Sequence, residues 1–132
     1  MNAMRASTML ALVTVLLGGA QVFAADAAKV LNVIAVKVKP GDQDAYLEKV
    51  KKLNALVKKS ESGGTLRVWR AAVAGADTGM IYVGIEYADL EAYAKSVSKL
   101  QASEDWKKQM KDLDASGLRE VLGSSLLVEV TP

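Results

Sequence analysis

The side chains with which this chain could do chemistry are few, because it contains neither histidine nor cysteine. Imidazole is the usual general base, and thiolate is the usual nucleophile and soft metal ligand. The chain therefore lacks the side chains that most often fill these roles. Carboxylates remain available to hard cations, but no group of Asp and Glu has the spacing of a calcium loop. The sequence therefore predicts no disulfide, no metal site and no cofactor.

The remaining candidates for a ligand site are an amide and several aromatic rings. Asn32 is the odd residue of an apolar strand face, and a buried amide must find a hydrogen-bond partner. It either lines a cavity between the sheet and the helices or only packs there. The predicted ligand pocket consists of Asn32, Tyr46, Tyr87, Tyr93 and Trp106. Packing alone can also explain the four rings, because they occupy core-facing positions of the periodic pattern.

A second set of candidates lies on a predicted hairpin. Directly paired residues of an antiparallel ladder share a face of the sheet. A four-residue loop at residues 75–78 pairs Ala74 with Gly79 and Ala71 with Tyr82. Counting back, the same register pairs Trp69 with Gly84 and Arg67 with Glu86.

This register has two chemical consequences. The indole of Trp69 can cover the bare backbone of Gly84, which is otherwise a weak point of a strand. Arg67 and Glu86 form a structural ion pair on a face that we expect to be buried in a dimer, where an unpaired charge is costly. The other interpretation makes the same two residues a catalytic acid and its activator.

Alternating and helical periodicities predict the elements that position these residues. They are strands at residues 29–39, 65–73, 78–87 and 124–130, and helices at residues 42–59, 89–100 and 103–117. The order βαββα(α)β contains no linker and no repeat. It indicates an α+β, ferredoxin-like layout, with an antiparallel sheet and helices on one face.

The helices carry their own boundary signals. Asp42, Asp89 and Ser103 are predicted N-caps, and Gly117 is a predicted end. In the first helix the spacing predicts a buried stripe of Tyr46, Val50, Leu53 and Val57. In the second helix it predicts burial of Leu90, Tyr93, Ala94, Val97 and Leu100.

The first 24 residues are typical of a signal peptide. A short start with one cation precedes an apolar stretch at residues 9–20, which is too short to cross a bilayer comfortably, since crossing takes roughly 20 residues. Val22 and Ala24 are the small residues that a signal peptidase requires. The sequence predicts cleavage after Ala24, a single domain at residues 25–132, and a periplasmic or secreted protein without membrane contact. The alternative is an uncleaved membrane anchor or a fortuitous apolar start.

Composition narrows the choice of partners. The 132 residues suit one domain, and the formal net charge of +2 is spread without a basic block. This distribution argues against nucleic acid as a partner. The lysines of the first helix, at residues 51–52 and 58–59, are typical of a solvated face.

Three local patterns resemble the dimeric α+β barrel superfamily. They are Pro40-Gly41 followed by Tyr46, the run EYADLEAY at residues 86–93, and SEDW at residues 103–106. The superfamily includes antibiotic-biosynthesis monooxygenases, stress-response barrel proteins, NIPSNAP-like domains and haem-handling proteins. The resemblance implies a homodimer in which two sheets face each other. The histidine on which the haem-handling members rely is missing, and no set of monooxygenase catalytic residues matches position by position.

The strand pattern agrees with a dimer. One sheet face carries Leu31, Val33, Ala35, Trp69 and Tyr82, and it is too apolar to face water. Three functions remain open. In the first, the chain is a non-catalytic exported homodimer or a binder of a small apolar ligand. In the second, it is a cofactor-independent monooxygenase or isomerase that acts on a quinol-like or polycyclic substrate. In the third, it is a structural partner of another periplasmic protein.

Overall fold

The computed structural model describes residues 28–132, and the predicted signal peptide with its cleavage point after Ala24 lies outside the described residues. The order of the elements is the predicted one. They are β1 (Val30–Lys37), the 3₁₀ turn η1 (Pro40–Asp42), α2 (Gln43–Lys59), β2 (Thr65–Arg70), the 3₁₀ turn η2 (Gly75–Asp77), β3 (Ile81–Tyr87), α3 (Leu90–Ala102), α4 (Glu104–Ser116) and β4 (Glu120–Val128).

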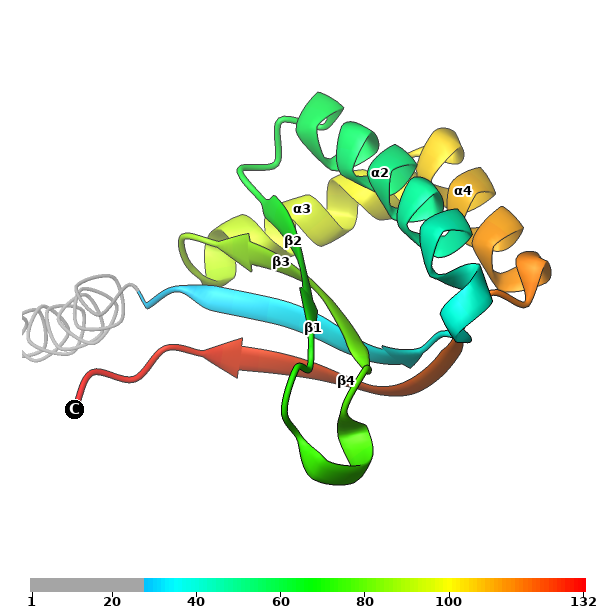
Figure 1. Cartoon of the computed structure of the whole chain (residues 1–132). Helices are drawn as coiled ribbons and strands as arrows, with labels where there is room; N and C mark the ends of the chain where they lie inside the picture. Colours follow the sequence, from blue (N-terminus) through cyan, green and yellow to red (C-terminus); the bar gives the residue numbers. More distant parts are fainter. Residues whose placement is uncertain (1–27) are drawn as a thin grey trace, which may run out of the picture.

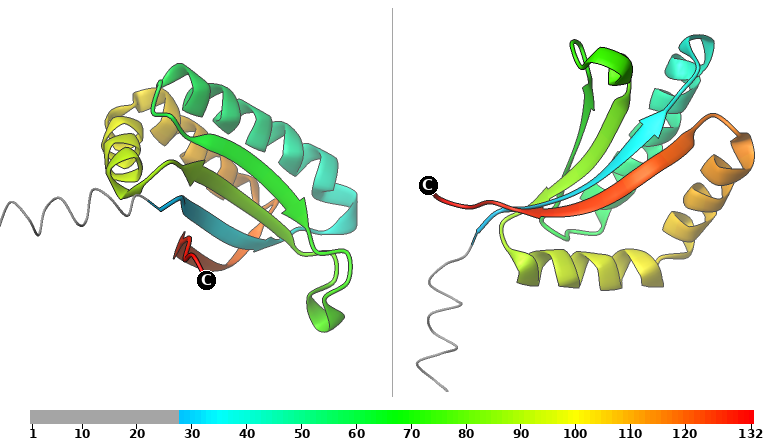
Figure 2. Two further views of the ribbon diagram at one scale, coloured as in Figure 1. Left: turned by 90° about the vertical axis from the view of Figure 1, so that its left-hand side faces the viewer. Right: turned by 90° about the horizontal axis from the view of Figure 1, so that it is seen from below.

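The strands form one antiparallel sheet in the order β2–β3–β1–β4. Helices α2, α3 and α4 all lie on one side of this sheet (Figure 1), and no described element covers the other side (Figure 2). This arrangement confirms the predicted α+β, ferredoxin-like fold.

Helix α2 buries the predicted stripe, but it is not capped as predicted. The buried residues are Tyr46, Val50, Leu53 and Val57. Asp42 precedes the helix, yet its side chain accepts no hydrogen bond from it. A capping residue normally has extended backbone, whereas Asp42 ends the turn η1 with φ −102° and ψ −3°. The chain therefore enters α2 through a 3₁₀ turn, and the predicted side-chain cap is wrong.

Helices α3 and α4 begin at the predicted caps, and α4 ends at the predicted glycine. The Asp89 carboxylate accepts a hydrogen bond from the Ala92 amide at 2.7 Å, and the Ser103 hydroxyl accepts one from the Trp106 amide at 3.2 Å. Gly117 ends α4 in the left-handed region, with φ +67°. These three predictions are confirmed.

The buried face of α3 is rotated from the predicted one. Leu90 is 53% exposed and Ala94 is exposed, whereas Ser96 and Leu100 are buried. Ser96 can take the central position because its hydroxyl lies 3.0 Å from the Tyr87 hydroxyl, which satisfies both polar groups. The prediction for Leu90 and Ala94 is therefore wrong.

Two apolar clusters between the sheet and the helices form the core. One is built of Val36, Val38, Tyr46, Val50, Leu53, Ile81, Val83 and Leu113. The other is built of Val30, Val57, Ile85, Tyr87 and Leu100. Leu66 and Trp106 pack against both clusters and so join them.

The β2–β3 hairpin has a different register from the predicted one. Arg67 pairs with Gly84, and Trp69 pairs with Tyr82. The predicted pairs Arg67–Glu86, Trp69–Gly84 and Ala71–Tyr82 are wrong by two residues. Because side chains alternate with a period of two, this shift keeps each of them on its predicted face.

The hairpin loop causes the shift, because it is longer than the predicted four residues. The ladder ends where Ala71 exchanges 2.8 Å hydrogen bonds with the Met80 carbonyl and the Gly79 amide. Beyond this point, the Ala74 amide donates to the Thr78 hydroxyl at 3.1 Å, around the turn η2. Since that amide bonds within the loop, it cannot pair with Gly79 as predicted.

Strand β4 begins at Glu120 and ends at Val128, whereas the predicted strand covers residues 124–130. It follows β1 over the full length of that strand, from the pair Val30–Val128 to the pair Lys37–Glu120. An irregularity between Ala35 and Val36 absorbs one extra residue of β4. A bulge of this kind breaks the alternation on which the predicted boundary depends.

Candidate functional site

The uncovered side of the sheet, which we call the open face, is a grid of three cross-strand rows. The rows run through β2, β3, β1 and β4 in that order. They are Trp69–Tyr82–Ala35–Gly123, Arg67–Gly84–Val33–Ser125 and Thr65–Glu86–Leu31–Leu127. All five apolar residues predicted for this face lie on it, together with Arg67 and Glu86.

Six residues of the open face surround a shallow hollow of about 370 Å³, which we call the sheet hollow. They are Leu31, Val33, Trp69, Tyr82, Ser125 and Leu127. Trp69 is 41% exposed and Leu127 is 51% exposed, so large apolar side chains face solvent here. The polar atoms that these side chains offer are two hydroxyls and one indole N–H, all of them neutral.

Trp69 reaches the sheet hollow because Gly84 has no side chain. A Cβ atom at Gly84 would lie 2.9 Å from Trp69 Cζ3 and 2.9 Å from Leu31 Cδ1. The indole and the leucine therefore close over bare backbone from two sides. The predicted contact between indole and glycine is confirmed, although Trp69 reaches Gly84 diagonally rather than as its ladder partner.

The predicted ion pair between Arg67 and Glu86 is absent. Among residues 28–132 the ion pairs are Lys51–Glu48, Lys95–Glu91, Lys107–Glu104 and Arg119–Asp114. The register explains the absence: glycine lies opposite Arg67, and Thr65 lies opposite Glu86.

The five residues predicted to form a ligand pocket lie on the helix side, and none of them lines the sheet hollow. Tyr46 and Tyr87 are fully buried but belong to different apolar clusters. The ring of Tyr93 packs edge-on against Tyr87, with 5.6 Å between the centroids. Trp106 packs against both clusters. Asn32 is half-buried between its ladder partners, Ile85 and Leu126.

The buried phenols are poor candidates for acid–base work. Burial raises the pKa of Tyr87, and the hydrogen bond with Ser96 opposes this only in part. Burial also raises the pKa of Tyr46, against the opposing effect of the nearby Arg119 guanidinium. Both hydroxyls are therefore protonated at neutral pH and cannot act as general bases.

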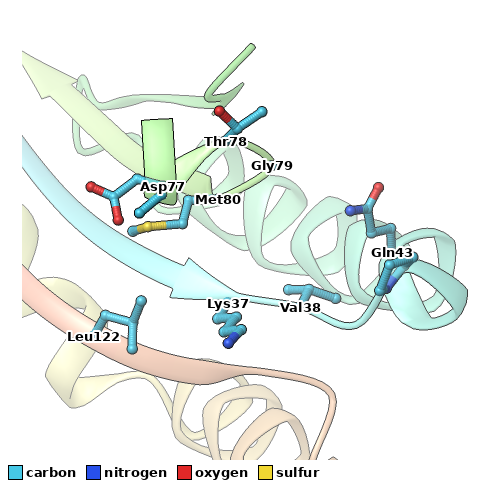
Figure 3. Close-up of a pocket in the computed structure, with 10 residues that line it drawn as sticks. Lys37, Val38, Gln43, Asp77, Thr78, Gly79, Met80 and Leu122 are labelled. Carbon is cyan, nitrogen blue, oxygen red and sulfur yellow. The ribbon is translucent and has the colours of Figure 1, made fainter. Parts of the chain in front are cut away.

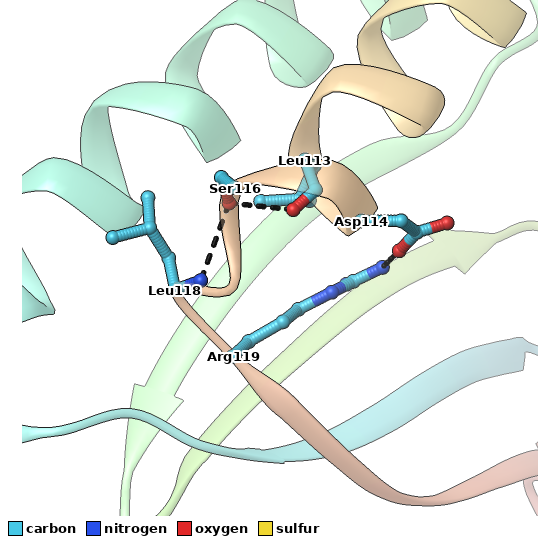
Figure 4. Close-up of polar contacts among 5 residues, drawn as sticks. All are labelled: Leu113, Asp114, Ser116, Leu118 and Arg119. Atoms are coloured by element: carbon cyan, nitrogen blue, oxygen red, sulfur yellow. Dashed lines mark hydrogen bonds and ion pairs between the residues drawn. The ribbon is translucent and has the colours of Figure 1, made fainter.

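Arg119 is a buried cation that the sequence does not predict. Its side chain is 7% exposed, and its Nη2 lies 3.0 Å from Asp114 Oδ1 (Figure 4). Its Nε and the Tyr46 hydroxyl are both buried without a well-formed hydrogen bond in the described part of the chain. The turn before it is held by the Ser116 hydroxyl, which donates to the Leu113 carbonyl and accepts from the Leu118 amide. No sequence signal marks this arginine, because it follows a glycine turn like a surface residue.

A second hollow, of about 310 Å³, lies between the hairpin loop and the ends of β1 and β4 (Figure 3). Its charged lining residues are Lys37 and Asp77, and they form no ion pair with each other. Gln43 and Thr78 add an amide and a hydroxyl. Because the Asp77 carboxylate and the Lys37 ammonium form no ion pair, this lining offers no coupled acid and base.

Residues 28–132 contain neither a metal site nor a membrane-spanning helix. No three His, Cys, Asp or Glu side chains of this region are placed to hold a metal ion together. Its helices are also too short or too polar for any of them to cross a membrane.

No protein-family model matches the chain, and neither does any curated protein sequence. Solved structures do match. A NIPSNAP family protein from Agrobacterium tumefaciens is 17% identical, with a TM-score of 0.58, over 79% of this chain and 90% of that one. A variant of SnoaB, a cofactor-independent oxygenase from Streptomyces nogalater, is 13% identical, with a TM-score of 0.57, over 79% and 95%. An uncharacterized NIPSNAP-like domain protein from Burkholderia xenovorans is 11% identical, with a TM-score of 0.57, over 80% and 87%.

At these identities the likeness shows the fold and nothing finer. The protein is a ferredoxin-like α+β domain whose helices cover one face of the sheet. Its fold is shared by NIPSNAP proteins and a cofactor-independent oxygenase. The fold that was predicted from the sequence is therefore also the fold of these solved structures.

Proposed function

We propose that the protein is a non-catalytic homodimer that holds a small apolar ligand between two copies of its open face. The observation that carries the proposal is the sheet hollow, an apolar depression on a face that no described element covers. Packing against a second copy would remove Trp69, Leu127 and their neighbours from water, which is the main driving force for association. The resemblance to the dimeric barrels supports the same arrangement of facing sheets.

The chemistry of the sheet hollow supports an apolar ligand rather than a reaction. Its walls are aliphatic and aromatic, and its polar atoms are the hydroxyls of Tyr82 and Ser125 and the indole N–H. A flat, uncharged molecule with one hydroxyl or carbonyl group fits such a lining. The hollow contains no carboxylate and no ammonium, so it offers no strong acid or base to a substrate.

The monooxygenase alternative requires its candidate groups to meet at one substrate. Asn32 pairs with Ile85 in the ladder and so lies on the helix side, whereas Trp69, Arg67 and Glu86 lie on the open face. The sheet separates these groups within one chain. The cofactor-independent activity in the name of SnoaB is a property of that protein, and at 13% identity the likeness carries only the fold to this chain.

We further propose that the protein works outside the cytoplasm, after cleavage behind Ala24. The support is the pattern of residues 1–24 alone. The test is mass analysis of the protein from the cell that makes it. A mature N-terminus at Ala25, or within a few residues of it, is expected. An intact Met1 on a membrane-bound form would contradict the proposal.

Native mass spectrometry of the protein purified from its own compartment tests the dimer and the ligand together. A dimer with extra small-molecule mass is expected, and the extra mass identifies the ligand class. A monomer would refute the dimer, and a dimer without added mass would leave only the structural role.

Two variants of β4 test whether the ligand binds in the sheet hollow. N-phenyl-1-naphthylamine is a neutral apolar dye whose fluorescence reports binding. Ser125→Phe fills the sheet hollow, so dye binding should fall. Ser124→Phe, one position along β4 on the other face, is the matched control and should leave binding unchanged. Equal dye binding by both variants would place the ligand elsewhere.

A further inference from the structure

Two opposite charges lie on the open face without partners in the described chain. Arg67 is exposed and Glu86 is half-buried, and neither takes part in an ion pair of residues 28–132. They occupy neighbouring strands in adjacent rows of the grid. An apolar face that becomes buried would normally exclude charged groups, because desolvating an unpaired charge is costly.

No charged side chain lies opposite either group in the ladder, and Lys29, which lines a shallow hollow together with Glu86, forms no ion pair with it. The ladder neighbour of Arg67 is Gly84, which has no side chain to contact the guanidinium. The ladder neighbours of Glu86 are Thr65 and Leu31, neither of which carries a positive charge. Each group therefore lacks a charged partner across the ladder, and each would need one if the open face were covered.

A second copy of the same face supplies both partners. In a two-fold interface, contact of residue i with residue j of the partner implies contact of j with i, so each complementary pair forms twice. An arginine and a glutamate on one face are thus self-complementary in charge. Arginine suits this role because its planar group can bind a carboxylate with two hydrogen bonds.

We propose that Arg67 of one protomer pairs with Glu86 of the other, so that two symmetric ion pairs fix how the facing sheets are oriented. This inference rests on the proposed homodimer. The sheet hollow would supply the apolar burial, and the ion pairs would select one orientation of the two copies and disfavour unrelated partners.

Charge reversal tests the inference. Arg67→Glu leaves two acids on the face, and Glu86→Arg leaves two arginines. Either variant alone should dimerise at least about tenfold more weakly than the natural chain, because like charges meet across the interface. An equal mixture of the two variants should form heterodimers, in which both cross-interface pairs are again attractive. Native mass spectrometry resolves the three dimer species by mass.

Arg70→Glu is the matched control, because Arg70 is exposed in the same strand but belongs to the helix side, 3.5 Å from Gln43. It should leave the dimer unchanged. Circular dichroism checks that each variant is folded. If one reversal variant does not fold, Arg67→Gln and Glu86→Gln replace the pair, and each should weaken the dimer.

The outcomes separate this inference from the proposed function. A monomeric natural chain would overturn both. A natural dimer whose strength neither variant changes would overturn the ion pairs and leave the dimer standing. Rescue by the double variant Arg67→Glu/Glu86→Arg without rescue by the mixture would place the pair within one chain, and this too would overturn the inference.

Discussion

Tyr46 and Tyr87 are both fully buried, but their hydroxyls have different surroundings. The Tyr87 hydroxyl lies 3.0 Å from the Ser96 hydroxyl, so both groups are satisfied. The Tyr46 hydroxyl lies near the Arg119 guanidinium, and it makes no well-formed hydrogen bond within the described chain. Residues of one type and equal burial therefore contribute differently to stability.

Replacing each tyrosine by phenylalanine measures this difference. Tyr87→Phe leaves the buried Ser96 hydroxyl without a partner and should cost about 1–2 kcal/mol of unfolding free energy. Tyr46→Phe removes a hydroxyl that lacks a good hydrogen bond, so it should change stability by less than about 0.5 kcal/mol. Urea denaturation of the two variants gives both values. An equally large loss for Tyr46→Phe would show that Arg119 holds this phenol by a hydrogen bond.

The same two phenols predict an alkaline loss of stability. Burial raises the pKa of both in the folded state, above the ordinary value of 10.0. Above that pH the folded protein binds more protons than the unfolded chain. Stability should therefore be independent of these groups below a pH of about 10, and should fall as the pH rises through the folded-state values.

Urea midpoints measured across this alkaline range test the sign. The double variant Tyr46→Phe/Tyr87→Phe should lose less stability between neutral and alkaline pH than the natural chain. The exposed pairs Lys51–Glu48 and Lys95–Glu91 raise the pKa of their lysines, but they are intact in both proteins and cancel in the comparison. Parallel curves for the two proteins would contradict a raised pKa at either tyrosine.

At the scale of the elements, the three predicted helix caps can be compared with one another, because two of them form a capping hydrogen bond and the third does not. Asp89→Ala and Ser103→Ala each remove a side-chain cap and should cost about 1 kcal/mol. Asp42→Ala removes no capping hydrogen bond and should cost less than about 0.5 kcal/mol. Thermal denaturation ranks the three variants. A cost at Asp42 equal to the others would mean that this side chain does cap α2.

The centre of β3 gives a second prediction at this scale. Gly84→Ala places a Cβ 2.9 Å from both Trp69 and Leu31, so the exposed indole must swing away. We expect a loss of about 1 kcal/mol and a shift in Trp69 emission, measured in a Trp106→Phe background. Gly123→Ala is the control, because a Cβ there meets nothing within 4 Å. Unchanged emission in the Gly84 variant would contradict the contact.

Periodicity was sufficient for the order of the elements, the stripe of α2 and the faces of the strands, because alternation and helical spacing follow from backbone geometry. It was not sufficient where a single side-chain bond decides. The Ala74 amide donates to the Thr78 hydroxyl within a loop that is longer than predicted, and the hairpin register differs from the predicted one by two residues. A serine partner for Tyr87 likewise turns the buried face of α3 toward Ser96.

The candidate site was predicted less well than the fold. Of the rings expected to line a pocket, Tyr46 and Tyr87 are buried in the core, and Tyr93 and Trp106 pack against it half-buried, as large rings at such positions do whether or not a cavity exists. The pocket itself stays a prediction. The open face was predicted, since alternation alone places Trp69 and Tyr82 on it. The part of the open face that β4 contributes was not predicted, because the bulge at Ala35/Val36 interrupts the alternation of side chains between the two faces. Nothing local to the sequence marks Arg119, whose guanidinium lies near Tyr46 of α2 and bonds Asp114 of α4.

For the whole molecule, the central question is what covers the open face. Val33 lies in the middle row of the grid and lines the sheet hollow. If two copies of this face meet, Val33→Asp buries two carboxylates in an apolar interface, and the dimer should weaken by at least about 100-fold. Size-exclusion chromatography with light scattering over a dilution series measures the change. Val73→Asp is the matched control, because Val73 is 96% exposed in the hairpin loop and should leave the dimer intact. Equal dimerisation by both variants would mean that the two copies meet through another surface.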